Sequence, residues 1–187
     1  AVCGGGCRDA VRVLGSCGQR WVGGRSSADA MVSAWGGARD GVLAEFVVLD
    51  RSGLVAMPPH LSFEEASTLP CAALTAWHSL VEMGQLKAGD TVLLLGTGGV
   101  SVMAHQFAVM SGAKVIITSS SDEKLARAKA MGAWQTINYK AHPDWEKIVL
   151  DMTDGLGVDH VVEVGGAGTV ARSVAAARVG GTIGMIG

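Results

Sequence analysis

The stretch that decides the fold is TVLLLGTGGVS, residues 91–101. Its first five residues are apolar or β-branched without polar alternation, as in a strand that is buried on both faces of a parallel sheet. The glycines that follow predict a tight loop. A helix begins inside this loop, and its predicted inner face carries Val100, Met103, Ala104 and Phe107.

Strands and helices alternate from this stretch to the end of the sequence. Further strands are predicted at residues 114–118, 135–139, 158–164 and 182–186. Helices are predicted between them, at residues 121–131, 145–152 and 170–177, and a second glycine loop lies at residues 165–168. Such alternation with short loops predicts an α/β fold with a doubly wound parallel sheet of Rossmann type.

Upstream of residue 91, the patterns predict two short strands and two helices. The strands are residues 42–49 and 54–57. Ser62 and Glu65 form an S-x-x-E capping box that opens the first helix. The second helix runs from Pro70 to Met83, and one of its faces carries Leu74, Trp77, His78 and Val81.

Residues 1–40 show no helical or strand period over more than a few residues. They hold nine Gly and three Cys. Cys3 and Cys7 form one close pair of potential metal ligands, with Cys17 further along. Zinc sites usually add a second pair, so we interpret these cysteines as incidental. The segment is expected to be a poorly specified or altered remnant of a domain.

Composition excludes several classes of function. The 187 residues include 15 Lys or Arg and 17 Asp or Glu, a formal net charge of −2, and 5% are aromatic. A nucleic-acid-binding protein needs a basic face or stacking residues, so that class is excluded. No apolar run approaches the roughly 18 residues of a membrane span, and no signal peptide is visible. With four unevenly spaced Cys, the expected setting is the reducing cytoplasm.

The first glycine loop has the form of a phosphate-binding loop. It reads G-x-G-x-x-S from Gly96 to Ser101. The first Gly permits the turn, and the second removes the side chain that would block a pyrophosphate at the helix N-terminus. The third position usually carries Gly or Ala, so the larger Ser101 is expected to loosen the packing of helix against strand. The alternative interpretation is a purely structural turn.

The end of the second strand indicates which nucleotide binds. An NAD-binding domain has a carboxylate about 20 residues beyond the loop, on the ribose 2′-hydroxyl. Here the sequence reads Thr118-Ser119-Ser120-Ser121, while Asp122 already lies in the next helix, followed by Lys124. Hydroxyls and a cation favour a 2′-phosphate, and therefore NADP, with NAD as the alternative. In a purely structural interpretation, Ser121 only caps its helix and Lys124 is solvated.

Four segments carry a family resemblance: LPCAALTAW at residues 69–77, GTGGV at 96–100, GAWQTINY at 132–139 and GGTI at 180–183. Together they resemble the medium-chain dehydrogenase/reductase superfamily, in particular its zinc-type alcohol dehydrogenase-like and quinone oxidoreductase-like branches. The resemblance implies an NADP(H)-dependent oxidoreductase. Such an enzyme transfers hydride to or from a carbonyl, an alcohol or an activated alkene, and the cofactor carries the chemistry.

The resemblance also implies roles for individual residues. Gly98, Gly99 and Val100 would contact the pyrophosphate, and Thr75 would lie near the nicotinamide. The 2′-phosphate would be held by Ser120, Ser121, Lys124 and Tyr139, and the far side of the nicotinamide would be lined by Val164, Gly165 and Gly187. The predicted cofactor-binding set is therefore Thr75, Gly96, Gly98, Gly99, Val100, Ser119, Ser120, Ser121, Lys124, Tyr139, Val164, Gly165 and Gly187. No catalytic residue is identified.

The sequence departs from the family's pattern at both ends. Residues 1–57 are expected to be a partial or altered remnant of a GroES-like catalytic domain. Residues 58–187 are expected to be a dinucleotide-binding domain that lacks its last strand, so that the sheet is incomplete and the chain truncated. The alternative function is therefore a catalytically incomplete fragment that binds nucleotide without turnover. The strand at 182–186, left uncovered, predicts homo-oligomers through an exposed sheet edge.

Zinc is not expected to bind. Cys71 stands where zinc-containing members of the family have a ligand, but a catalytic zinc needs three protein ligands, and the family's other ligands have no match here. Cys71 is therefore interpreted as a buried apolar residue. The five His, at positions 60, 78, 105, 142 and 160, are scattered and form no set with a carboxylate and a nucleophile.

Overall fold

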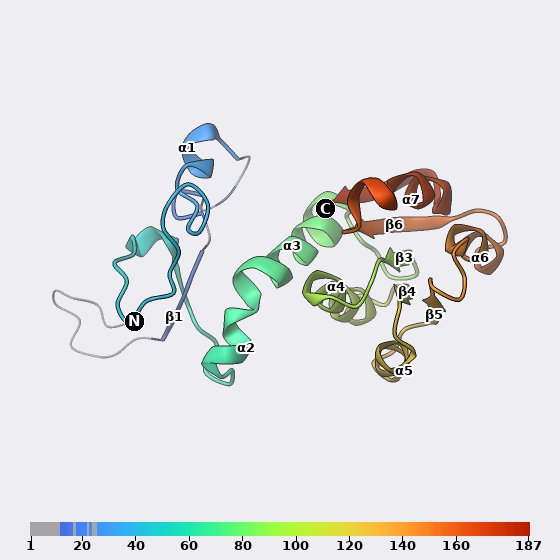
Figure 1. The fold of residues 1–187 in the computed structure, drawn as a ribbon, viewed down its shortest axis with the longest axis horizontal. Coiled ribbons are helices and arrows are strands. Elements are labelled where there is room, and N and C mark those ends of the chain that lie inside the picture. Colours follow the sequence, from blue (N-terminus) through green and yellow to red (C-terminus); the bar gives the residue numbers. More distant parts are fainter. Residues whose placement is uncertain (1–11, 17, 22, 24–25) are drawn as a thin grey trace. The chain divides into compact units, whose positions relative to one another are not determined.

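The computed structural model describes residues 12–16, 18–21, 23 and 26–187 (Figure 1). Cys3, Cys7 and Cys17 lie outside the described residues, so the structure does not test their interpretation. The chain divides into two compact units, Ala1–Cys71 and Ala72–Gly187. Each unit is described below by itself.

The first unit is built from short elements. Strand β1 (Val13–Gly15) pairs antiparallel with β2 (Leu54–Ala56), which confirms the strand predicted at residues 54–57. The helical elements are α1 (Ala28–Met31), η1 (Arg51–Gly53) and α2 (Phe63–Ser67). The capping box of α2 is also confirmed, because Glu65 N donates to the Ser62 hydroxyl at 3.1 Å and Ser62 N donates to the Glu65 carboxylate at 2.8 Å.

The strand predicted at residues 42–49 is wrong. The segment begins with bends at residues 42, 44 and 45 and belongs to no strand. Most of its apolar side chains are exposed, with relative accessibilities of 105% for Leu43, 85% for Phe46 and 93% for Val48, whereas Val47 and Leu49 are half-buried. A β-strand exists only where a neighbouring strand accepts its backbone hydrogen bonds, and none of the described residues pairs with this segment in a ladder. Apolar, β-branched composition was therefore not sufficient to form a strand.

The second unit contains a five-stranded parallel sheet with the strand order β5-β4-β3-β6-β7. This order confirms the predicted α/β fold with a doubly wound sheet. Strand β3 lies at the centre of the sheet, and the glycine loop follows it directly. The strands are β3 (Thr91–Leu94), β4 (Lys114–Ser119), β5 (Gln135–Asn138), β6 (Val158–Glu163) and β7 (Ala177–Met185).

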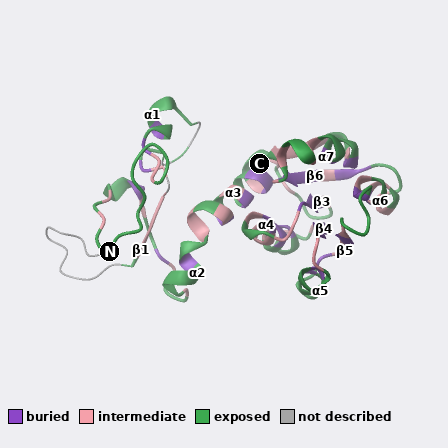
Figure 2. Cartoon of the chain, in the orientation of Figure 1, coloured by how far each residue is buried: buried purple, intermediate pink, exposed green. Residues whose placement is uncertain are grey.

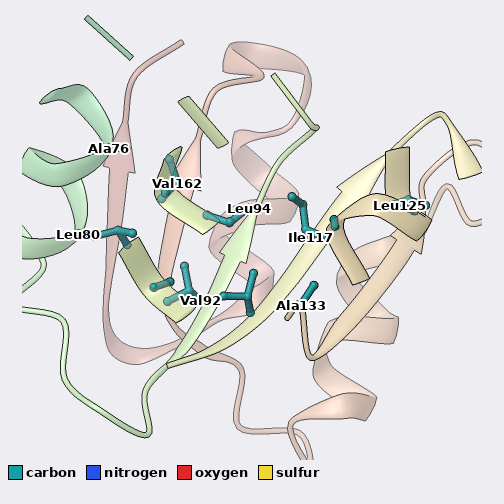
Figure 3. Packing of buried hydrophobic residues seen from close by; sticks show 12 residues of the cluster. Ala76, Leu80, Val92, Leu94, Ile117, Leu125, Ala133 and Val162 are labelled. Atoms are coloured by element: carbon teal, nitrogen blue, oxygen red, sulfur yellow. The ribbon is translucent and has the colours of Figure 1, made fainter. Parts of the chain in front are cut away.

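Helices cover both faces of this sheet, so that the buried residues concentrate between the layers (Figure 2). On one face, α3 (Leu74–Trp77), α4 (Gly99–Met110) and α5 (Asp122–Ala130) share an apolar cluster with Val92, Leu94 and Ile117 (Figure 3). On the other face, α6 (Trp145–Met152) and α7 (Val170–Ala176) pack on Leu93 and Leu95. Alternate residues of one strand thus enter opposite clusters, which explains the unbroken apolar run of β3.

The helical segment before β3 buries a different face from the predicted one. It consists of two π-helical elements, η2 (Leu69–Ala73) and η3 (His78–Met83), on either side of α3. Leu74 and Trp77 of the predicted face are exposed, whereas Ala76 and Leu80 are buried. A π-helical turn takes up more residues than an α-helical turn, so a 3.6-residue period does not follow the buried face here. No helix among the described residues is long and apolar enough to cross a membrane.

Strand β7 is the outer strand of the sheet and is longer than predicted. Its register slips between Val158 and His160 of β6, which marks a bulge at the residues around Gly180. Gly184 is close-packed, because a Cβ added there would overlap the hydroxyl of Ser79 on η3. Among the described residues, β7 pairs only with β6, so its other edge has no strand partner.

Candidate functional site

The glycine loop lies where the strand order of the sheet reverses. The chain leaves β3 to form β4 and β5 on one side, and then crosses back to form β6 and β7 on the other. In open parallel sheets, a crevice forms beyond the carboxyl ends of the strands at such a switch point, and ligands bind there. Apart from Thr75 on α3 and Lys124 on α5, the predicted cofactor-binding residues lie at or just beyond the ends of β3, β4, β5, β6 and β7, as this topology requires.

The loop itself leaves backbone donors available for an anion. Gly96 has a φ of +71°, which a residue with a side chain rarely adopts. Gly98 is the N-cap of α4 and supplies no side-chain cap, so the N–H groups of the first helical turn have no partner within the helix. A Cβ added at Gly98 would meet nothing within 4 Å, and Gly98 and Gly99 are both exposed. Open donors at the positive end of a helix dipole suit a pyrophosphate.

Ser101 joins α4 to the chain just beyond the central strand, at the position where looser packing was expected. Ser101 is buried, and its hydroxyl donates a 2.7 Å hydrogen bond to the carbonyl oxygen of Leu95. The side chain that exceeds the usual Gly or Ala thus supplies a donor to the end of β3. The hydrogen bond ties α4 to the central strand just before the glycine loop.

Hydroxyl groups at the end of β4 form hydrogen bonds with the first glycine loop. Gly96 N donates to the Thr118 hydroxyl at 3.0 Å, and the hydroxyls of Thr97 and Ser119 lie 2.9 Å apart. Ser119 is buried, and its hydroxyl also accepts a 3.3 Å hydrogen bond from Ser121 N. Thr118 and Ser119 therefore bond to the protein itself, while Ser120 and Ser121 remain partly accessible.

Tyr139 and Ser121 lie at this same end of the sheet. Tyr139 N donates to the carbonyl oxygen of Ser119 at 3.1 Å, so the end of β5 is joined to the end of β4. As predicted, Ser121 caps α5, because its hydroxyl accepts a hydrogen bond from Lys124 N. The nearby carboxylate of Asp122 is engaged, since the side-chain amide of Asn138 donates to it at 2.6 Å.

Two cations line a small cavity beside these hydroxyls. The cavity has a volume of about 170 Å³, and Thr97, His105, Lys124 and Arg127 line it. Neither Lys124 nor Arg127 forms an ion pair with any residue in the described part of the chain. The sequence analysis missed Arg127, although its spacing of three residues from Lys124 on one helix was a signal that both lie on one face.

His105 forms the inner part of this cavity. It is buried, and its Nε2 atom has no hydrogen-bond partner. Burial lowers the pKa of His105 below its ordinary value of 6.5. At neutral pH the side chain is therefore a neutral imidazole.

On the other side of β3, the second glycine loop is built around a carboxylate. Glu163, the last residue of β6, is fully buried. Its side chain accepts hydrogen bonds from Gly165 N at 2.7 Å, Gly166 N at 3.0 Å and the Thr169 hydroxyl at 2.6 Å, all on Oε1. The Ser173 hydroxyl donates to Oε2. Glu163 was missed by sequence reasoning, although a carboxylate at the end of the apolar run Val161-Val162 is itself an unusual feature.

Three predicted nicotinamide-side residues meet at this loop. Val164 and Gly165 follow Glu163 directly, and Gly187 N donates to the carbonyl oxygen of Glu163 at 3.2 Å. A Cβ at Gly187 would lie 2.5 Å from the carbonyl oxygen of Val164, so the two segments are in close contact. Thr75 lies apart from them, half-buried on α3, which packs against α4.

The described residues do not fit a zinc ion. Cys71 is exposed, so its interpretation as a buried apolar residue is wrong. It lies on a π-helical element whose buried side carries Ala73. No group of three or more His, Cys, Asp or Glu side chains in the described part of the chain could hold a metal. The expectation that no zinc binds stays a prediction.

Comparison with known proteins decides the family. The family model described as zinc-binding dehydrogenase matches residues 99–187. A zinc-type alcohol dehydrogenase-like protein of Schizosaccharomyces pombe is 54% identical over 157 residues, which are 83% of this chain and 45% of the yeast protein. The chain belongs to the medium-chain dehydrogenase/reductase superfamily. The resemblance found in the sequence is thereby confirmed.

Solved structures of this superfamily share the fold. A Sinorhizobium meliloti structure assigned as an alcohol dehydrogenase superposes with a TM-score of 0.87 at 44% identity, over 94% of this chain and 52% of that chain. An NAD-dependent alcohol dehydrogenase gives a TM-score of 0.75 at 45% identity, over 80% of this chain and 44% of the other. The chain thus spans about half the length of these relatives. Members of the superfamily are oxidoreductases that depend on a nicotinamide dinucleotide.

Proposed function

We propose that this chain binds NADP(H) and forms the nucleotide-binding part of an oxidoreductase. Such an enzyme would transfer hydride between the nicotinamide and a carbonyl, an alcohol or an activated alkene. The observation that carries the proposal is the end of β4. Hydroxyls bond to the glycine loop there, Lys124 and Arg127 line a cavity together with Thr97 of the loop, and the carboxylate of Asp122 accepts a hydrogen bond from Asn138.

Different residues of this site would bind different parts of the cofactor. The N–H groups of the Gly98–Val100 turn would hold the pyrophosphate, because they lack partners within α4. The exposed ammonium of Lys124 and the guanidinium of Arg127 would neutralise a 2′-phosphate, assisted by Ser120, Ser121 and Tyr139. Thr118 and Ser119 would act through the loop, since their hydroxyls are bonded to it.

The other end of the crevice would hold the nicotinamide. Val164, Gly165 and Gly187 converge there around the end of β6, and Gly165 and Gly187 are exposed, so their backbone is accessible to a flat ring. Thr75 would approach from α3. The bound nicotinamide would supply the hydride, while the chain binds and orients it.

The binding test compares NADPH with NADH by the fluorescence of the reduced nicotinamide. NADPH is expected to bind more tightly. Lys124→Ala should weaken NADPH more than NADH by about 1–2 kcal/mol, as for a charge-assisted hydrogen bond. Equal losses for the two cofactors would refute the preference for NADP, and NAD is the alternative that the name of one structural relative supports.

A matched control lies on the same helix. Lys129 is also an exposed lysine of α5, but its ammonium donates to the carbonyl oxygen of Trp134 and does not line the cavity. Lys129→Ala removes the same charge from α5, so it should leave the ratio of the two affinities unchanged. Arg127→Ala should act like Lys124→Ala.

A second candidate function is nucleotide binding without turnover. It is favoured by one observation in the first unit, where the apolar segment at residues 42–49 is exposed and unpaired. Steady oxidation of NADPH in the presence of a quinone or an α,β-unsaturated aldehyde would favour the oxidoreductase. Binding of NADPH without oxidation across such substrates would favour the second candidate.

We also propose the domain organisation, setting and assembly expected from the sequence. Residues 1–57 would derive from a catalytic domain and residues 58–187 from a nucleotide-binding domain. The proposed setting is the cytoplasm. The unpaired edge of β7 would join copies of the chain into homo-oligomers, since an exposed strand edge offers free backbone donors and acceptors.

A further inference from the structure

Glu163 is a buried carboxylate that the proposed chemistry does not use. It has no cation partner among the described residues, yet its side chain is fully removed from solvent. Burying a carboxylate is costly unless hydrogen bonds replace its hydration. Here two backbone N–H groups and two hydroxyls supply those bonds, from Gly165, Gly166, Thr169 and Ser173. An apolar side chain would fill the strand position without that cost. We therefore infer that the role of the carboxylate is to hold the second glycine loop through these hydrogen bonds.

The hydrogen bonds of Glu163 act on the shape of the second glycine loop. Three of the four donors come from the loop and from Thr169, which directly follows it, and they converge on a single oxygen, Oε1. The loop is tight, because a Cβ on Gly165 would overlap the Thr169 side chain. The main-chain carbonyl of the same Glu163 accepts from Ile186 N at 2.9 Å and from Gly187 N, so the chain beyond β7 is held as well.

The second glycine loop lies where one half of a bound dinucleotide would extend. Strand β3 lies between β4 and β6, and the glycine loop after β3 lies between their carboxyl ends. The hydroxyls and cations suited to a phosphorylated ribose lie on the β4 side. A dinucleotide that crosses the switch point therefore extends its other half over the end of β6.

We propose that Glu163 is a positioning residue for the nicotinamide half of the bound cofactor. Its carboxylate fixes the backbone of Gly165 and Gly166 in the one arrangement against which that half of the cofactor rests. The inference rests on the proposed function. It predicts that loss of the carboxylate weakens ligands that reach the β6 side and spares ligands that occupy only the β4 side.

The test compares NADPH with adenosine 2′,5′-bisphosphate, which contains only the adenosine half. Glu163→Ala should weaken NADPH by about tenfold or more and change the bisphosphate by less than about twofold, since only the β6-side loop is released. Glu163→Gln keeps an oxygen for the loop donors and should restore NADPH binding to within about threefold of the parent chain.

Two further variants separate positioning from stability. Ser173→Ala removes the bond to Oε2 but leaves the three loop donors in place, so it should lower the unfolding midpoint and spare NADPH affinity. Thr169→Val keeps the shape of the side chain and removes one loop donor, so it should weaken NADPH alone, and it substitutes for Glu163→Ala if that variant does not fold.

Each outcome supports or overturns one claim. Equal weakening of both ligands by Glu163→Ala, or by Thr169→Val in its place, would show that the carboxylate only stabilises the fold. Unchanged NADPH affinity in these variants would show that the loop does not support the cofactor. NADPH binding by the parent chain is measured before any variant is made. Failure of the parent chain to bind NADPH would refute the proposed function instead.

Discussion

Ser101→Ala is expected to destabilise the second unit, although it restores the residue that phosphate-binding loops usually carry at this position. The Ser101 hydroxyl donates a 2.7 Å hydrogen bond to the carbonyl oxygen of Leu95, and both residues are buried. Removing the donor leaves a buried acceptor without its partner, which costs about 1–3 kcal/mol. Alanine recovers about 0.5 kcal/mol through its higher helix propensity. The expected net loss is about 0.5–2.5 kcal/mol.

Urea unfolding followed by far-UV circular dichroism measures this loss. With a slope of about 2 kcal/mol per molar urea, the midpoint should fall by roughly 0.25–1.25 M at an unchanged slope. Ser67→Ala is a suitable control, because the Ser67 hydroxyl also donates to a carbonyl oxygen at 2.7 Å but is exposed to water. Its effect should be within about 0.5 kcal/mol. A midpoint that stays or rises in Ser101→Ala would refute the reasoning and favour looser packing by serine.

The remaining predictions concern pH, packing and metal. Burial lowers the pKa of His105 below 6.5, so the folded state resists a proton that the unfolded chain accepts. Stability should therefore be kept above pH 6.5 and fall as the pH drops below it; urea midpoints of His105→Gln should lack this loss, and an equal loss in both proteins would contradict it. Gly184→Lys, which would protect an ordinary sheet edge, should lower the free energy of unfolding by about 1–3 kcal/mol because its Cβ overlaps Ser79; a free energy equal to that of the parent chain would show that η3 moves aside. Elemental analysis should find no stoichiometric zinc in the purified protein, and one zinc per chain that is lost in Cys71→Ser would overturn this.

The fold of the second unit was predictable because its signals are local. The apolar run of β3 is buried on both faces, and the glycines that follow open α4, so strand, loop and helix each follow from neighbouring residues. The strand at residues 42–49 failed for the opposite reason. Its composition is that of a strand, but strand formation depends on a partner elsewhere in the chain.

The candidate site was predictable in its outline and not in its hydrogen bonds. Glycine positions and the missing carboxylate after β4 are visible in the sequence. The hydrogen bonds of Ser119 with Thr97, and of Asp122 with Asn138, depend on contacts between elements that are separate in the sequence. Glu163 was overlooked because its donors come from a loop and a helix whose geometry only the folded chain defines.

The central place of β3 also has a consequence for the order in which the domain is assembled during synthesis. Val92 of β3 pairs with Val115 of β4, which follows soon along the chain, and with His160 of β6, which follows much later. The β3–β4–β5 half can therefore form while one edge of β3 is still open, and loop closure favours these nearer contacts. Until β6 is made and docks, that open edge is an apolar strand with free backbone groups, which is the form most prone to wrong pairing. A nascent chain that stalls between β5 and β6 should therefore be the species that chaperones retain.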